Sequence, residues 1–118
     1  MKIHLFDKST DFTVMPAGQV IFNEGDAGDC MFAVIGGEID IVVNGRVIET
    51  VGPSSIFGEM ALVEDQPRSA KAVVKSEAKI VKVDRNRFLF MVQQTPYFAL
   101  NVLTLVTQRL RRRMAESN

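Results

Sequence analysis

The segments Phe57-Gly58-Glu59-Met60-Ala61-Leu62 and Pro67-Arg68-Ser69-Ala70 bring a flexible turn, a helix start and a cation into fourteen residues, with a short acidic spacer between them. Gly58 lets the backbone turn sharply and approach a ligand, because it has no side chain. The helix-forming residues after it leave their first N–H groups unpaired, which suits an anion. Arg68 adds a planar guanidinium that can bind a phosphate through two parallel hydrogen bonds. This stretch therefore predicts an anion site built on a turn.

Glu59 restricts the kind of anion that such a site would bind. An ionised carboxylate only accepts hydrogen bonds, so it is misplaced beside a phosphate unless the ligand also offers a hydroxyl group. A ligand with one phosphate and a nearby sugar hydroxyl satisfies the turn, Arg68 and Glu59 together. The three features predict a nucleotide.

The two segments, at this spacing, resemble the phosphate-binding cassette of the cyclic nucleotide-binding domain family. The similarity covers about residues 11 to 114, and it is close to cytoplasmic domains of bacterial cyclic nucleotide-gated channels and to catabolite-activator-type sensor domains. Outside the cassette it is carried by Pro16, Gly18, Gly25-Asp26, Gly28-Asp29, Phe32 and Gly36-Gly37.

The resemblance implies roles for individual residues. The expected ligand-binding residues are Gly58, Glu59, Met60, Ala61, Arg68, Ser69, Ala70, Val43 and Arg109. The cassette turn and Arg68 would hold the phosphate, and Glu59 would accept from the ribose 2′-hydroxyl. The Ser69 hydroxyl would contact the phosphate or a syn guanine, while Val43 would contact either purine. Arg109 matches an arginine that stacks on the base in channel-type members.

Residues 13–84 alternate short apolar stretches with turn residues, which predicts strand after strand. Asn44-Gly45 is a strong hairpin signal, and Gly36-Gly37 predicts a turn between strands at 30–35 and 39–43. A second hairpin is predicted from residues 71–74 and 79–83. Short strands at this spacing favour a sandwich or barrel. With a turn of helix in their middle they resemble the antiparallel, jelly-roll-like β-roll of the family.

Two helices are predicted after the strands, at residues 85–95 and 96–114. Asp84 is a suitable N-cap for the first, and Thr95-Pro96 separates the two. The second carries Leu103, Val106, Leu110 and Met114 at helical spacing, and the resemblance implies that it closes over the bound base. The predicted fold is thus mainly β with flanking helices. It forms one domain over residues 1–118, with a short N-terminal segment at residues 1–10.

The composition excludes several functions. Lys plus Arg equals Asp plus Glu, 14 each, so no overall field attracts nucleic acid or a membrane. The basic residues 111–113 suit the C-terminal end of a helix dipole. One histidine and one cysteine cannot supply the usual metal-ligand sets or a catalytic triad. We therefore expect no enzyme activity, no metal and no cofactor besides the ligand.

Other features favour a cytoplasmic protein. The sequence has no apolar stretch long enough for a membrane span and no leader pattern. The single cysteine cannot form an internal disulfide, which suits a reducing cytoplasm. Beside Met31 and Phe32, Cys30 is expected to be a small buried hydrophobe rather than a nucleophile. His4 is expected to be an ordinary surface side chain.

We expect a regulatory sensor domain that binds cyclic AMP and signals to an unidentified effector protein or domain. Cyclic AMP is favoured over cyclic GMP by the resemblance to bacterial members. The alternative is a ligand-independent interaction module that keeps the fold. A transcription factor of the catabolite-activator type would need a helix-turn-helix after the last helix, and the chain end at Asn118 is expected to leave no room for one.

Overall fold

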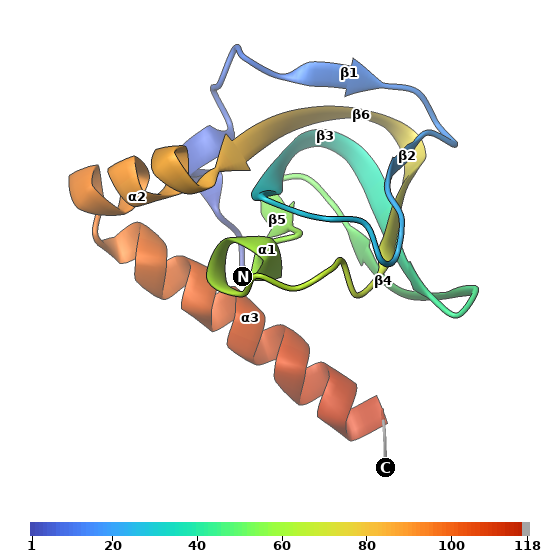
Figure 1. Ribbon diagram of the computed structural model, residues 1–118. Coiled ribbons are helices and arrows are strands. Elements are labelled where there is room, and N and C mark those ends of the chain that lie inside the picture. The colour runs from blue at the N-terminus through green and yellow to red at the C-terminus, as the bar shows by residue number, and fades with distance from the viewer. Residues whose placement is uncertain (117–118) are drawn as a thin grey trace.

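Two long strands, β3 (Cys30–Val43) and β6 (Lys71–Asp84), form the centre of the structure. They pair antiparallel from Cys30↔Asp84 to Val42↔Lys71, so the pairing covers almost their whole length. Both strands are rich in β-branched residues, which pack well on a pleated surface. The structure is a computed structural model, and it describes residues 1–116 (Figure 1). The last two residues of the predicted domain lie outside the described part.

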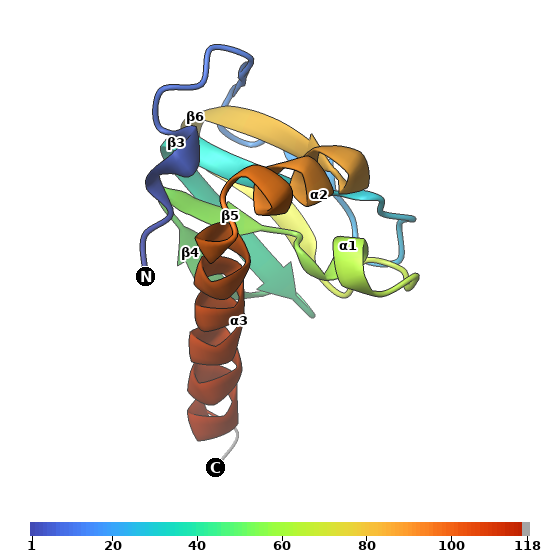
Figure 2. The same ribbon diagram turned by 90° about the vertical axis from the view of Figure 1, so that its left-hand side faces the viewer.

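The shorter strands attach to these two and complete a six-stranded antiparallel sheet. β1 (Thr13–Met15) and β2 (Val20–Phe22) pair with β6, while β4 (Arg46–Val51) and β5 (Ser55–Phe57) pair with β3. The remaining elements are η1 (His4–Phe6), α1 (Met60–Val63), α2 (Arg85–Gln94) and α3 (Tyr97–Glu116). This arrangement confirms the predicted β-roll with two C-terminal helices. Figure 2 shows α3 leaving the end of α2 and running past β5.

The core divides into two clusters of buried side chains. One lies between the sheet and the helices, where Phe6 and Phe98 meet edge to face with ring centroids 5.9 Å apart. The other lies inside the roll and includes Phe57, Ile39 and Ile80. Fully burying an apolar side chain of this size contributes about 1.5–3 kcal/mol. The first cluster therefore fixes the N-terminal segment and the start of α3 to the sheet.

Two local predictions are confirmed. The Asp84 carboxylate caps α2, accepting a hydrogen bond from the Arg87 backbone N–H at 2.8 Å. Asn44-Gly45 connects β3 to β4 with positive φ at both residues, 51° and 75°, as a two-residue hairpin turn requires.

Two other predictions are wrong. Gly36-Gly37 does not end a strand, because β3 runs through it with shifts of register. Residues 71–74 and 79–83 do not form a hairpin, because β6 is continuous. The polar residues 75–77 looked like a turn in the sequence. They instead form the exposed middle of β6, where Ser76 pairs with Glu38.

The apolar stripe expected on α3 faces outward for the most part. Leu103, Leu110 and Met114 are 59–60% exposed, whereas the buried residues of the helix are Phe98, Val102 and Leu105. Both sets have helical spacing, so periodicity alone did not identify which set is buried against the roll. Within residues 1–116 no single helix has the length and apolar composition to cross a membrane. Helices α2 and α3 meet these two criteria only when they are taken together, as a pair bent by 118°.

Replacing Gly37 with alanine should destabilise the roll. Gly37 has φ +78°, and an added Cβ would lie 2.2 Å from the Glu77 carbonyl oxygen. Gly45 has a similar φ, +75°, but open space around it, so Gly45→Ala is the matched control. We expect Gly45→Ala to cost about 1–2 kcal/mol from left-handed strain, and Gly37→Ala to cost a further ~1–3 kcal/mol from the clash. Urea unfolding measures both, and equal losses would contradict the role given to the close approach.

Candidate ligand-binding site

The cassette turn is positioned by strand β5. Phe57, the last residue of β5, pairs with Phe32 of β3, so Gly58 emerges beside the first residues of β3. Gly58 has φ +75°, and a Cβ there would lie 2.8 Å from Nη1 of Arg68. The predicted helical turn follows as α1. Gly58 therefore provides both the turn and the space that Arg68 occupies.

Arg68 is the one buried charged residue in the described part of the chain, with 8% of its surface exposed. Its backbone is fixed by two hydrogen bonds to the 25–26 turn: its N–H donates to the Asp26 carbonyl, and its carbonyl accepts from the Gly25 N–H, both at 2.8 Å. Its guanidinium donates to the carbonyls of Gly58 (2.9 Å) and Cys30 (2.7 Å).

Phe22 and Gly28 complete the surroundings of the Arg68 guanidinium. The guanidinium carbon lies 4.2 Å from the centroid of the Phe22 ring, within range of a cation–π interaction. A Cβ on Gly28 would lie 2.4 Å from Nε of Arg68, so the guanidinium fits only against a glycine. The side chain is thus held on two sides by glycines and on a third by an aromatic ring.

Nε of Arg68 is buried without a hydrogen-bond partner, and among residues 1–116 no other side-chain nitrogen or oxygen is in that situation. A buried donor left unpaired costs about 1–3 kcal/mol, and more when it is charged. Arg68 also forms no ion pair with any described carboxylate. A cation with this environment suits an anionic ligand.

Glu59 lies at a second point of the site, where it meets helix α3. Its Oε1 accepts a hydrogen bond from Nη1 of Arg109 at 3.1 Å. Nε of Arg109 donates to Oε2 of Glu49 at 2.9 Å, and Nη2 donates to the Ile56 carbonyl. The side chains of Arg109, Glu49 and Glu59 are 14%, 20% and 12% exposed. The structure thus brings two of the predicted residues, Glu59 and Arg109, into direct contact.

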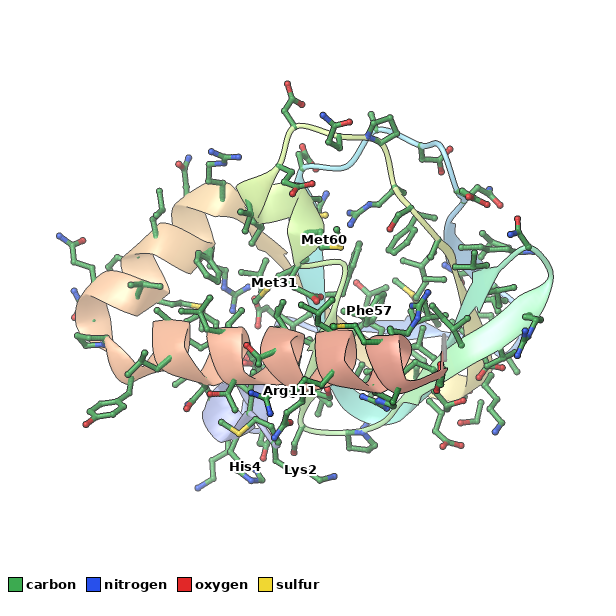
Figure 3. All side chains as sticks on the ribbon, turned by 90° about the horizontal axis from the view of Figure 1, so that it is seen from below. Lys2, His4, Met31, Phe57, Met60 and Arg111 are labelled. Atoms are coloured by element: carbon green, nitrogen blue, oxygen red, sulfur yellow. The ribbon has the colours of Figure 1, made fainter. Side chains whose placement is uncertain are left out.

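The other predicted residues differ in how far they are covered. Ala61, Ala70 and Val43 are half-buried, and Ser69 is exposed. Met60, which is labelled in Figure 3, is 54% exposed on α1. Their contacts with a ligand stay predictions. The stacking of Arg109 on a base also stays a prediction, since here its guanidinium contacts Glu49, Glu59 and Ile56.

Sequence reasoning missed several groups of the site. Glu49 gave no signal, because it stands in an ordinary alternating strand and its partner is 60 residues away. The carbonyls of Cys30 and Ile56 belong to the backbone and leave no trace in residue identity. Gly28 was noticed only as a family-like glycine, although its lack of a side chain is what admits Arg68.

Cys30 and His4 are placed as predicted. Cys30 is buried, and burial raises the pKa of its thiol above the ordinary value, which keeps it neutral. His4 is exposed and contacts Asp7 at 2.7 Å. In the described residues, no group of three or more His, Cys, Asp or Glu side chains is placed to hold a metal ion.

Comparison with known proteins identifies the family. The family model described as "Cyclic nucleotide-binding domain" matches residues 12–95, and the chain belongs to this family. The Cyclic AMP receptor protein of Thermus thermophilus is 32% identical over 101 residues, which is 81% of this chain and 47% of that protein. The chain therefore spans about half the length of this curated relative.

Solved structures agree with this assignment. The crystal structure of the Thermus thermophilus Catabolite Activator Protein has a TM-score of 0.77 at 30% identity, covering 89% of this chain and 53% of that one. The regulatory domain of Toxoplasma gondii PKA, co-crystallised with cAMP, has a TM-score of 0.61 at 32% identity, covering 66% and 31%. The resemblance inferred from the cassette is confirmed.

Proposed function

We propose that this chain is a sensor domain that binds a cyclic mononucleotide, cyclic AMP first of all, and signals to an effector protein or domain. The observation that carries the proposal is Arg68, a buried cation with an unpaired Nε and no carboxylate partner, next to the Gly58 turn. A cyclic nucleotide offers one phosphate for this cation. The relatives named for cyclic AMP support the same ligand.

In this proposal the phosphate lies on the Gly58–Ala61 turn and takes hydrogen bonds from Arg68. Glu59 accepts from the ribose 2′-hydroxyl through Oε2, since Arg109 already occupies Oε1. Ser69 and Ala70 close the cassette. The proposed function consists of binding alone, and no chemical step is assigned to any residue.

Titration calorimetry with cyclic AMP and cyclic GMP tests the proposal directly. We expect both to bind and cyclic AMP to bind more tightly. The exposed Ser69 hydroxyl permits cyclic GMP without requiring it, and the apolar Val43 contacts either purine alike. A clear preference for cyclic GMP would overturn the choice of base. Binding of neither nucleotide would favour the alternative, a ligand-independent interaction module.

Substitution of Arg68 should weaken binding strongly. Charge-assisted hydrogen bonds contribute about 1.5–3 kcal/mol, so Arg68→Ala is expected to raise the Kd from about tenfold to a few hundredfold. Arg68→Lys should recover only part of this, because an ammonium lacks the planar fork. Arg85→Ala, which removes an exposed arginine at the start of α2, is the matched control.

Because Arg68 also holds two carbonyls in place, its variants must be compared at a temperature where circular dichroism shows them folded. An affinity for cyclic AMP that is unchanged in folded Arg68→Ala would show that the phosphate binds elsewhere.

The role of Glu59 is tested by removing the hydroxyl rather than the carboxylate. We expect 2′-deoxy cyclic AMP to bind wild-type protein about ten- to a hundredfold more weakly than cyclic AMP, because a hydrogen bond to a charged acceptor is lost. Calorimetry on Glu59→Gln provides the control, since this variant should discriminate much less between the two ligands. Equal affinity of the wild type for both would mean that Glu59 serves only the helix dipole.

A further inference from the structure

Helix α3 is attached to the roll in two different ways along its length. Its first half is held by apolar burial at Phe98, Val102 and Leu105. From Leu110 to Glu116 every residue is exposed. Between these parts stands Arg109, whose side chain is only 14% exposed. The ion pairs of Arg109 therefore mark the point at which the enclosed part of the helix ends.

Arg109 joins α3 to three other parts of the fold at once. Nε donates to Glu49 on β4, Nη2 to the Ile56 carbonyl on β5, and Nη1 to Glu59 at the start of the cassette helix. These partners are 50 to 60 residues away in the chain. Because the guanidinium is planar, fixing the hydrogen bonds of Nε and Nη2 also fixes the direction in which Nη1 donates.

The carboxylates of Glu59 and Glu49 have different roles in this arrangement. Glu59 belongs to the cassette, and one of its oxygens remains as an acceptor for a ligand hydroxyl. Glu49 lies outside the cassette on β4, and it accepts from Nε, whereas Glu59 accepts from Nη1. Glu49 can therefore keep Arg109 on the roll while Glu59 is engaged by a ligand.

We propose that Glu49 is a positioning residue for the ligand site. It holds Arg109, and Arg109 holds the Glu59 carboxylate in the orientation that presents Oε2 to the ligand. The same cation thereby links the occupancy of Glu59 to the end of the enclosed part of α3. The link to the ligand rests on the function proposed above, whereas the Glu49–Arg109–Glu59 contacts stand on the described side chains alone.

Because they are buried, these ion pairs matter more to the structure than exposed pairs would. Ion pairs on an open surface contribute little, because water and salt screen them and the side chains lose rotamer freedom. Here all three side chains are at least four-fifths covered. Removing one partner of a covered pair leaves the other charge without compensation. Loss of Glu49 should therefore let Arg109 move toward water and release Glu59 from its fixed orientation.

The experiment compares Glu49→Ala and Glu49→Gln with wild type in the full chain. Glu49→Ala removes the acceptor, and Glu49→Gln keeps an acceptor but removes the charge, so a smaller effect is expected for glutamine. Glu77→Ala, at an exposed glutamate of β6, is the matched control. Hydrogen exchange is measured on residues 106–116 without ligand, and calorimetry is carried out with cyclic AMP and 2′-deoxy cyclic AMP.

In Glu49→Ala we expect faster exchange in residues 106–116 with the sheet unchanged. Its affinity for cyclic AMP should fall about two- to tenfold, which is the change in Kd expected when one hydrogen bond is weakened. Its affinity for the 2′-deoxy ligand should stay nearly constant, because that ligand does not use Glu59. A merely structural role of Glu49 would weaken both ligands alike.

Three results would overturn parts of this inference. Unchanged exchange in Glu49→Ala would show that Glu49 does not hold α3. Equal loss of affinity for the two nucleotides would exclude positioning of Glu59. If wild-type protein bound neither nucleotide, the proposed function and the link to the ligand would both fail, and the exchange data alone would decide whether Glu49 holds the helix.

Discussion

The antiparallel pairing of β3 with β6 is the constraint on which the rest of the structure depends. Every other strand pairs with one of these two. At Phe32, β3 stands between β6 and β5, with Lys82 on one side and Phe57 on the other. The Cys30 carbonyl and the Gly58 turn consequently meet at the same end of the sheet. Arg68 donates to both groups at this point, so the position of its guanidinium is a consequence of strand register.

Features of the fold and of the candidate site were predictable from sequence where they depend on neighbouring residues. A glycine before a short helix, an Asn-Gly hairpin and an aspartate cap each act within a few residues, and all three appear as predicted. The continuity of β6 was not predictable in this way. Its polar middle, residues 75–77, is strand only because β3 pairs with it, and that pairing is a property of the folded chain.

Long-range contacts account for most of the remaining differences. The inner and outer faces of α3 have the same period, and only the position of the helix on the roll buries Phe98, Val102 and Leu105 rather than Leu103 and Leu110. The Glu49–Arg109 pair spans 60 residues, and nothing in the sequence around Glu49 marks it as the partner of Arg109. Tertiary packing selects among patterns that local chemistry leaves equivalent.

The two arginines of the candidate site differ in how their charges are compensated. Arg109 has two carboxylates and a carbonyl for its donors, so its charge is compensated within the protein. Arg68 is more deeply buried, yet in the described structure its guanidinium donates only to two carbonyls and a thiol, with aromatic rings beside it. A buried charge without a counterion is costly. An anion bound at Arg68 would relieve that cost, whereas one bound at Arg109 would compete with carboxylates already in place. We therefore propose that Arg68 binds the anion and that Arg109 holds Glu59 and helix α3 in register with it.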